Sequence, residues 1–199
     1  KIPIVESFLN GEEALIIGSS WPSDIDKLYP VMNAFKDQLK FIIAPHNIND
    51  QEIVNIQKSI GMPSVKFSEA TDHQAIDKHS VLIIDNIGML SSLYRYGKYA
   101  YIGGAFRGAL HNTLEAAVYG VPVFFGNHEN NRKFREAIDL IDVKGAFQFN
   151  ESGELIQLLS EFQQNKNELE RAGLASKNWV ENSKGATTKI MNYLKEINN

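Results

Sequence analysis

Residues 99 to 126 read Tyr99-Ala-Tyr-Ile-Gly-Gly-Ala-Phe-Arg-Gly-Ala-Leu-His-Asn-Thr-Leu-Glu-Ala-Ala-Val-Tyr-Gly-Val-Pro-Val-Phe-Phe-Gly126. The first four residues form an apolar run of the kind that favours a β-strand, and a glycine pair follows directly. The segment 112–119 has helical spacing, and Gly120 with Pro122 just beyond it is typical of a helix end. A second apolar run, 121–125, comes next. A strand, a helix and a strand in this order predict a βαβ unit of a parallel sheet.

The same alternation covers most of the chain. Short apolar runs predict further strands at 14–18, 40–44, 65–67 and 81–84, and an edge strand at 146–149. Helical spacing predicts further helices at 24–39, 49–60, 89–96 and 132–141, and a polar helical tail from residue 153 to the end. We therefore expect an α/β fold, with a Rossmann-like parallel sheet of about six strands and helices on both faces.

The two ends of the chain differ from its middle. Residues 1–12 contain Pro3 and the pair Asn10-Gly11, which are typical breaks in regular structure. We interpret them as a connector from a preceding domain, and residues 13–199 as a single Rossmann-like domain with a helical C-terminal tail. That tail has few apolar side chains, and we expect them to pack on a part of the protein outside this sequence: Leu174, Trp179, Val180, Ile190, Met191 and Leu194.

The composition excludes several classes of protein. With 199 residues, of which 43% are hydrophobic, the chain has room for one well-buried domain. A net charge of −4 with scattered signs gives no basic stripe, so we expect no nucleic acid partner. The sequence has no cysteine, which fits a reducing compartment. Its apolar runs are far shorter than the ~20 residues of a membrane helix and it has no signal pattern, so we expect this chain itself to be soluble.

Several catalytic motifs are absent from the sequence. It contains no phosphate loop of the Gly-x-x-x-x-Gly-Lys-Ser/Thr type, no Gly-x-Ser-x-Gly elbow and no Gly-x-Gly-x-x-Gly after the first strand. The five histidines lack the paired spacing of a zinc protease. We therefore expect no metal site and no cofactor, and we find no self-contained set of acid, base and nucleophile.

Ligands of open parallel sheets bind beyond the carboxyl ends of the strands, and four segments follow predicted strands there. They are Ser19 and Ser20, then Pro45 and His46, then Gly88, Met89 and Leu90, and finally Gly104 with Asn112, Thr113, Leu114 and Glu115. In the last segment, helix-terminal N–H groups suit a phosphate and the carboxylate of Glu115 suits two ribose hydroxyls.

Each segment also has a purely structural interpretation. Asn112 and Glu115 have the spacing of a capping box, which satisfies a helix start without any ligand. Ser19 and Ser20 are typical turn formers or caps. His46 is of a kind often found in solvated loops, and a simple turn between strand and helix explains Gly88. Local pattern alone leaves both interpretations open.

The segment 102–126 resembles the C-terminal domain of the bacterial 3-deoxy-D-manno-octulosonic acid (Kdo) transferases. These proteins carry a Gly-Gly, a His-Asn-x-Leu-Glu and a Gly-x-Pro-Val-x-x-Gly in this order, as this chain does. Other segments also resemble family motifs in order and spacing: Gly18-Ser-Ser-Trp, Pro45-His46 and Gly88-Met89-Leu90. The chain departs from the family at Ala109-Leu110, where many members have two glycines, and at Asn127, where many have proline.

The resemblance implies that the chain is the C-terminal half of a GT-B glycosyltransferase and binds the donor CMP-Kdo. The positions that match the nucleotide contacts of the family are Pro45, His46, Gly88, Met89, Leu90 and the run from Asn112 to Glu115. The implied reaction transfers Kdo to a lipid A precursor in lipopolysaccharide biosynthesis, at the cytoplasmic face of the bacterial inner membrane. The catalytic base and the membrane contact belong to an N-terminal domain that this sequence lacks, so we expect the chain alone to be inactive.

Two other functions remain open from the sequence. One is donor binding in another GT-B enzyme, a UDP-sugar transferase or epimerase, because a glutamate at a helix start followed by Gly-Val-Pro is shared across that class. The other is a noncatalytic Rossmann-like module that binds a ligand. The identity of the nucleotide separates these functions from the binding of CMP-Kdo.

Overall fold

The computed structural model describes residues 1–70, 76–183, 185, 191 and 193. These residues form a parallel, seven-stranded sheet in the order β3-β4-β2-β1-β5-β6-β7. The strands are β1 (Ala14–Ser20), β2 (Lys40–Pro45), β3 (Ser64–Lys66), β4 (Val81–Ile83), β5 (Tyr99–Ile102), β6 (Val123–Gly126) and β7 (Ala146–Phe149). The α/β prediction is confirmed, and the edge strand expected at 146–149 completes the sheet.

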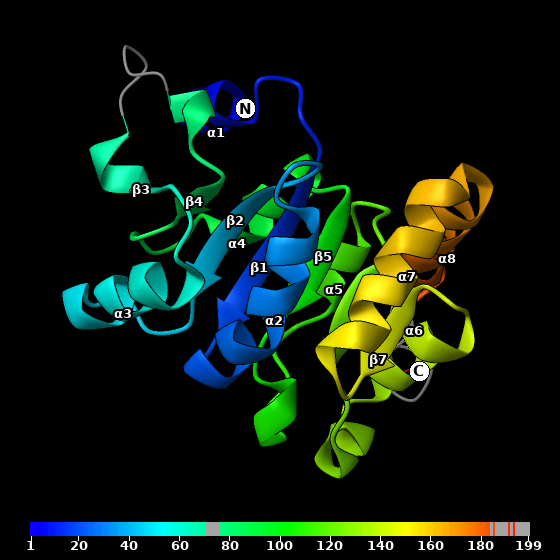
Figure 1. The fold of residues 1–199 in the computed structure, drawn as a ribbon. Helices are drawn as coiled ribbons and strands as arrows, with labels where there is room; N and C mark the ends of the chain where they lie inside the picture. Colours follow the sequence, from blue (N-terminus) through cyan, green and yellow to red (C-terminus); the bar gives the residue numbers. More distant parts are fainter. Residues whose placement is uncertain (71–75, 184, 186–190, 192, 194–199) are drawn as a thin grey trace.

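Helices cover both faces of the sheet (Figure 1). The helices α2 (Pro22–Phe35), α3 (Asp50–Ile60) and α7 (Ser152–Gln164) cover one face. The other face carries α1 (Pro3–Leu9), α4 (Leu90–Leu93), α5 (Leu114–Ala117) and α6 (Arg135–Asp142). Each face has its own buried apolar cluster, because alternate side chains of the strands point to opposite sides. This two-sided burial explains why the strands read as continuous apolar runs.

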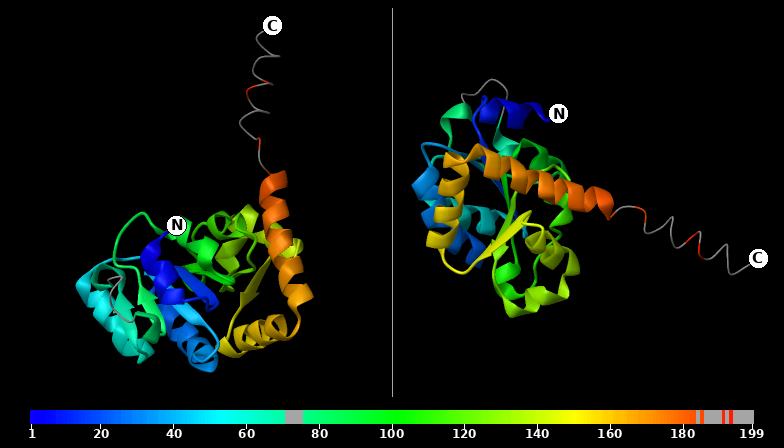
Figure 2. Two further views of the ribbon diagram at one scale, coloured as in Figure 1. Left: turned by 90° about the horizontal axis from the view of Figure 1, so that it is seen from above. Right: turned by 90° about the vertical axis from the view of Figure 1, so that its right-hand side faces the viewer.

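The last described helix, α8 (Lys166–Asn182), links the two faces beyond β7. Its Ala172 packs in the same cluster as α2 and α7, whereas Trp179 and Val180 pack on the cluster of α5 and α6. Figure 2 shows α8 as a long helix at this end of the molecule. The prediction of an outside partner is wrong for Trp179 and Val180, because they pack within this chain. For Leu174, which is 57% exposed, it stays a prediction. Ile190 and Leu194 lie outside the described residues.

Pro3 and Asn10-Gly11 indicated an irregular segment at residues 1–12, but these residues contain the helix α1. Pro3 begins α1, because proline fits the first helical turn, where its missing N–H has no partner to lose. Val5 and Phe8 are fully buried in the core. Asn10 ends the helix with a left-handed backbone. The interpretation of this segment as a link to another domain stays a prediction.

Short helices and 3-10 turns follow several strand ends. The 3-10 turns are η1 (Phe67–Glu69), η2 (Ile76–Lys78), η3 (Tyr94–Tyr96), η4 (Ala105–Arg107) and η5 (Glu129–Lys133). The helix predicted at 112–119 is only the single turn α5. It is shorter because the side chain of Asn112 binds the backbone N–H of Leu114 and because Gly120 takes a left-handed backbone with φ of 73°.

Candidate functional site

The order in which strands are added to the sheet reverses between β1 and β5. The strands β2, β3 and β4 lie on one side of β1, and β5, β6 and β7 lie on the other. The strand β1 pairs with β2 on one side and with β5 on the other, so β1 and β5 flank the switch point of the sheet. The loops after these strands diverge there and leave room for a ligand at the carboxyl edge. All four predicted segments lie at this edge, although Ser19 and Ser20 are the last residues of β1 and Pro45 is the last residue of β2 rather than loop residues after them.

The turn after β1 packs tightly against the loop after β5. Ser19 has a left-handed backbone with φ of 52°. A Cβ on Gly103 would lie 2.2 Å from the carbonyl oxygen of Ser19, so only glycine fits there. Ser20 is 1% exposed and pairs in register with Pro45 of β2. Its Oγ has no hydrogen-bond partner among the described residues, so one buried hydroxyl at this edge is unused.

Asp24 joins the two loops. It lies in the first turn of α2 and is 0% exposed. One carboxylate oxygen accepts the backbone N–H of Trp21 at 2.8 Å and that of Gly104 at 2.9 Å, and the other accepts the hydroxyl of Tyr101 at 2.6 Å. Burial and the nearby Asp24 raise the pKa of Tyr101 well above its ordinary value, so Tyr101 remains a donor. A buried carboxylate with three donors holds the turn and the glycine pair in one fixed relation.

Aromatic side chains from three loops meet above Asp24. The imidazole of His46 stacks on the indole of Trp21 with ring centroids 4.2 Å apart, and His111 lies 4.6 Å from His46. The indole N–H of Trp21 donates to Nε2 of His111 at 3.4 Å. The guanidinium of Arg107 lies 4.1 Å from the centre of the Trp21 ring.

The hydrogen bond from Trp21 fixes the tautomer of neutral His111. Nε2 accepts that bond, so in neutral His111 the proton is on Nδ1. Burial and the neighbouring His46 lower the pKa of His111, and Asp24 partly offsets this effect. His111 is therefore a neutral group near pH 7 and contributes a hydrogen-bond donor rather than a charge.

The predicted segment around Asn112 forms a small side-chain network. Asn112 accepts the N–H of Leu114 through Oδ1 at 3.0 Å and donates to Glu115 through Nδ2 at 3.2 Å. This contact is similar to the capping alternative, although the backbone bond goes to Leu114 rather than to Glu115. Thr113 is 1% exposed, and its Oγ1 has no partner among the described residues. The hydroxyls of Ser20, Ser23 and Thr113 are thus buried at or beside the carboxyl edge without a partner among the described residues.

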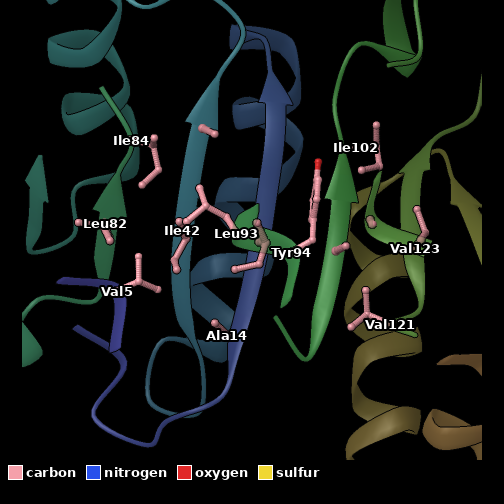
Figure 3. Packing of buried hydrophobic residues seen from close by; sticks show 14 of the residues in the cluster. Val5, Ala14, Ile42, Leu82, Ile84, Leu93, Tyr94, Ile102, Val121 and Val123 are labelled. Carbon is pink, nitrogen blue, oxygen red and sulfur yellow. The ribbon is translucent and has the colours of Figure 1, made fainter. Parts of the chain in front are cut away.

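Tyr94 connects Glu115 with the end of β1. Figure 3 shows its hydroxyl pointing toward the strand ends at which Ile84 and Ile102 lie. A Cβ on Gly18 of β1 would lie 1.9 Å from this hydroxyl oxygen, so a side chain at position 18 would displace Tyr94. Burial, and secondarily the charge of Glu115, raise the pKa of Tyr94.

The segment after β4 lies somewhat apart. Gly88 has a left-handed backbone with φ of 91°. Gly88 and Met89 line a cavity of about 270 Å³ together with the first two residues of the chain and residues of α4 and η3. Only Leu90 reaches the β1 end, where its Cδ1 would contact a Cβ on Gly18. The contacts among the described residues thus bring together the segments at the ends of β1, β2 and β5. Leu90 links them to the segment after β4.

Sequence reasoning missed several residues that build this edge. Trp21 and His111 were part of quoted motifs but were not singled out, and Asp24, Tyr94 and Tyr101 were not considered. An acidic residue three positions after a helix cap was a signal for Asp24, but that pattern indicates only a local bond. Its bonds to Gly104 and Tyr101 depend on the strand order.

Within residues 1–70, 76–183, 185, 191 and 193, no group of three or more histidine and acidic side chains has the geometry to hold a metal ion. None of the helices in that part of the chain has the length and apolar character to cross a membrane.

Curated proteins similar to this chain include several Kdo transferases. A 3-deoxy-D-manno-octulosonic acid transferase of Chlamydophila psittaci is 29% identical over 118 residues, which are 58% of this chain and 27% of that protein. A protein of the same name from Aquifex aeolicus is 26% identical over 166 residues, which are 79% of this chain and 44% of that protein. The chain therefore spans less than half the length of these relatives. No protein-family model matches the sequence.

A solved structure gives the same result for the fold. The C-terminal CMP-Kdo binding domain of WaaA from Acinetobacter baumannii has a TM-score of 0.73 at 18% identity, covering 89% of this chain and 97% of that one. The chain is a relative of the Kdo transferases. This Kdo transferase relative has the fold of a GT-B glycosyltransferase domain, and it matches nearly the whole of a C-terminal domain. The predicted likeness to Kdo transferases and the predicted fold class are confirmed.

Proposed function

We propose that this chain binds CMP-Kdo and serves as the donor-binding half of a Kdo transferase. One observation carries the proposal beyond the likeness to known proteins. His46 of the Pro-His pair, His111 of the His-Asn-x-Leu-Glu motif and Trp21 of the first motif are in direct contact at the switch point of the sheet. The segments that resemble the family's nucleotide contacts thus converge where a parallel sheet binds its ligands.

Each proposed contact has a chemical role. The carboxylate of Glu115 accepts the vicinal ribose hydroxyls, since one of its oxygens is already oriented by Asn112. Pro45 and His46 contact the edge of the cytosine, and backbone groups of Gly88, Met89 and Leu90 approach it from the other loop. Ser19, Ser20 and Thr113 lie beside the donor's polar groups in this proposal, and the buried hydroxyls of Ser20 and Thr113 have no other partner among the described residues. Leu114 supports this arrangement, and Gly104 holds the loop through Asp24.

The whole protein transfers Kdo from CMP-Kdo to a lipid A precursor, with CMP as the leaving group, in lipopolysaccharide biosynthesis. The described residues bind and orient the donor, which contributes by removing the freedom of one reactant. The acceptor site and the catalytic base belong to a second domain that residues 1–12 connect to this one. We place the full-length protein at the cytoplasmic face of the inner membrane, with its membrane contact in that second domain.

A thermal-shift experiment tests the donor assignment. CMP stabilises the chain more than UMP or ADP does at the same concentration. At 100 times its dissociation constant, a ligand adds about 2.7 kcal/mol to the free energy of unfolding, which for a chain of this size raises Tm by roughly 5–10 °C. Glu115→Ala abolishes this increase while Tm without ligand stays close to that of the original chain.

The matched control is Glu170→Ala, which removes an equal charge from an exposed position of α8 and leaves the CMP shift intact. Equal shifts for CMP, UMP and ADP contradict the assignment. A larger shift with UMP indicates a UDP-sugar enzyme, and no shift with any nucleotide supports the noncatalytic module.

A further inference from the structure

Arg107 is a cation at the carboxyl edge whose charge is not neutralised. It ends η4, directly after the glycine pair, and its side chain is exposed. Among the described residues it forms no ion pair with a carboxylate, unlike Arg135 and Arg171, which pair with Asp139 and Glu168. Its guanidinium instead lies on the indole of Trp21. An arginine held on an aromatic face keeps its N–H donors available for an anion.

The acid that binds the backbone of Trp21 has no free oxygen for Arg107. Asp24 accepts from Trp21, Gly104 and Tyr101 and is 0% exposed, so its carboxylate has no exposed oxygen to offer Arg107. One of these bonds fixes the backbone of Trp21, and the guanidinium of Arg107 lies on the ring of that residue. Arg107 is therefore positioned by the ring of Trp21, which lies at the carboxyl edge beside His46.

The backbone of the loop after β5 offers an anion few donors. Most of its N–H groups already donate within the protein: Gly103 to Gly18, Gly104 to Asp24, Arg107 and Ala109 to Gly104, Gly108 to Ala105, His111 to Gly103 and Leu114 to Asn112. A glycine pair and a helix start would otherwise form a phosphate cradle. The N–H groups of Ala105, Phe106, Leu110, Asn112 and Thr113 are not among these donors, but they carry only partial charges. A full positive charge next to a phosphate at this loop comes from a side chain.

We propose that Arg107, held on Trp21, binds the phosphate of the nucleotide, so that one indole joins the phosphate contact to the base contact at His46. The inference rests on the proposed donor-binding function and adds a binding residue to it. Guanidinium donors match two phosphate oxygens at once, and the bond is charge-assisted. Trp21 is a positioning residue, because it orders Arg107 on its ring and also stacks with His46.

The test compares CMP with cytidine, which lacks the phosphate, by isothermal titration calorimetry. Arg107→Met weakens the binding of CMP by about tenfold or more and leaves that of cytidine within about twofold. The salt dependence of CMP binding also decreases in this variant, because a charge contact is lost. Trp21→Leu weakens both ligands, since it removes the support of Arg107 and the stacking partner of His46.

Arg171→Met is the control, since it removes an equal charge from α8 and changes neither affinity. The inference is overturned if Arg107→Met leaves CMP binding unchanged, or if it weakens cytidine as much as CMP. These results are distinct from a failure of the proposed function. If UMP binds as tightly as CMP, the donor assignment fails, while the comparison of UMP with uridine still tests Arg107.

Discussion

The buried hydroxyl of Tyr101 makes a measurable contribution to stability through Asp24. Tyr99 and Tyr101 both lie on β5 and are both 0% exposed. The hydroxyl of Tyr101 donates to Asp24 at 2.6 Å, whereas that of Tyr99 has no partner among the described residues. The two tyrosines therefore form a natural pair of test and control for one hydrogen bond.

Tyr101→Phe removes one of the three donors to a fully buried carboxylate. A hydrogen bond to a charged group contributes about 1.5–3 kcal/mol, and the remaining partner is left partly unsatisfied. For a chain of this size each kcal/mol corresponds to about 2–4 °C in Tm, so the expected fall is about 3–12 °C. Tyr99→Phe removes a hydroxyl that gains nothing on folding, and the change should stay within about 0.5 kcal/mol of zero or be stabilising.

Urea unfolding followed by circular dichroism measures both variants at neutral pH. Asp24→Asn and the double variant Asp24→Asn/Tyr101→Phe complete a double-mutant cycle, whose coupling energy isolates the bond. The reasoning is refuted if Tyr101→Phe loses no more stability than Tyr99→Phe. It is also refuted if the two changes at Asp24 and Tyr101 are additive.

Two further predictions concern the same edge. The pKa of His111 is lowered in the folded chain from its ordinary value of about 6.5. Between the folded pKa and that ordinary value, the unfolded chain binds more protons than the folded chain. The free energy of unfolding therefore falls as pH falls through about 6.5, and it levels off below the folded pKa. Denaturant titrations between pH 7.5 and 5 show a flatter profile for His111→Gln if this is correct. Gly103→Ala places a Cβ 2.2 Å from the carbonyl oxygen of Ser19, and we expect it to lower the free energy of unfolding by at least about 1–3 kcal/mol. The control Gly153→Ala adds an atom with nothing within 4 Å, and it leaves Tm nearly unchanged or raises it.

The elements of this fold were predictable because their signals are local. A continuous apolar run such as Val81 to Ile84 indicates a buried strand wherever it occurs, and Gly120 followed by Pro122 ends a helix by its own backbone chemistry. The errors arose where a local signal has two outcomes. Pro3 is typical of a break, but it also fits the first turn of a helix, and the burial of Phe8 decided between them.

The candidate site shows the same division. Glycine and polar residues after apolar runs identified which segments reach the carboxyl edge, since every parallel strand ends there. The contact of Trp21 with His46 and His111, however, requires β1 to lie between β2 and β5. Without that order, the motif resemblance was the only reason to join these segments into one site.

The sequence by itself determined the α/β class, the strand and helix segments and the likeness to Kdo transferases, because periodicity and motif spacing are properties of neighbouring residues. Only the tertiary structure decided that Asp24 binds Gly104 and Tyr101 and that Arg107 lies on Trp21. These contacts join residues from separate βα units. Their partners follow from the order of strands in the sheet and from close packing at its switch point, which no local pattern encodes.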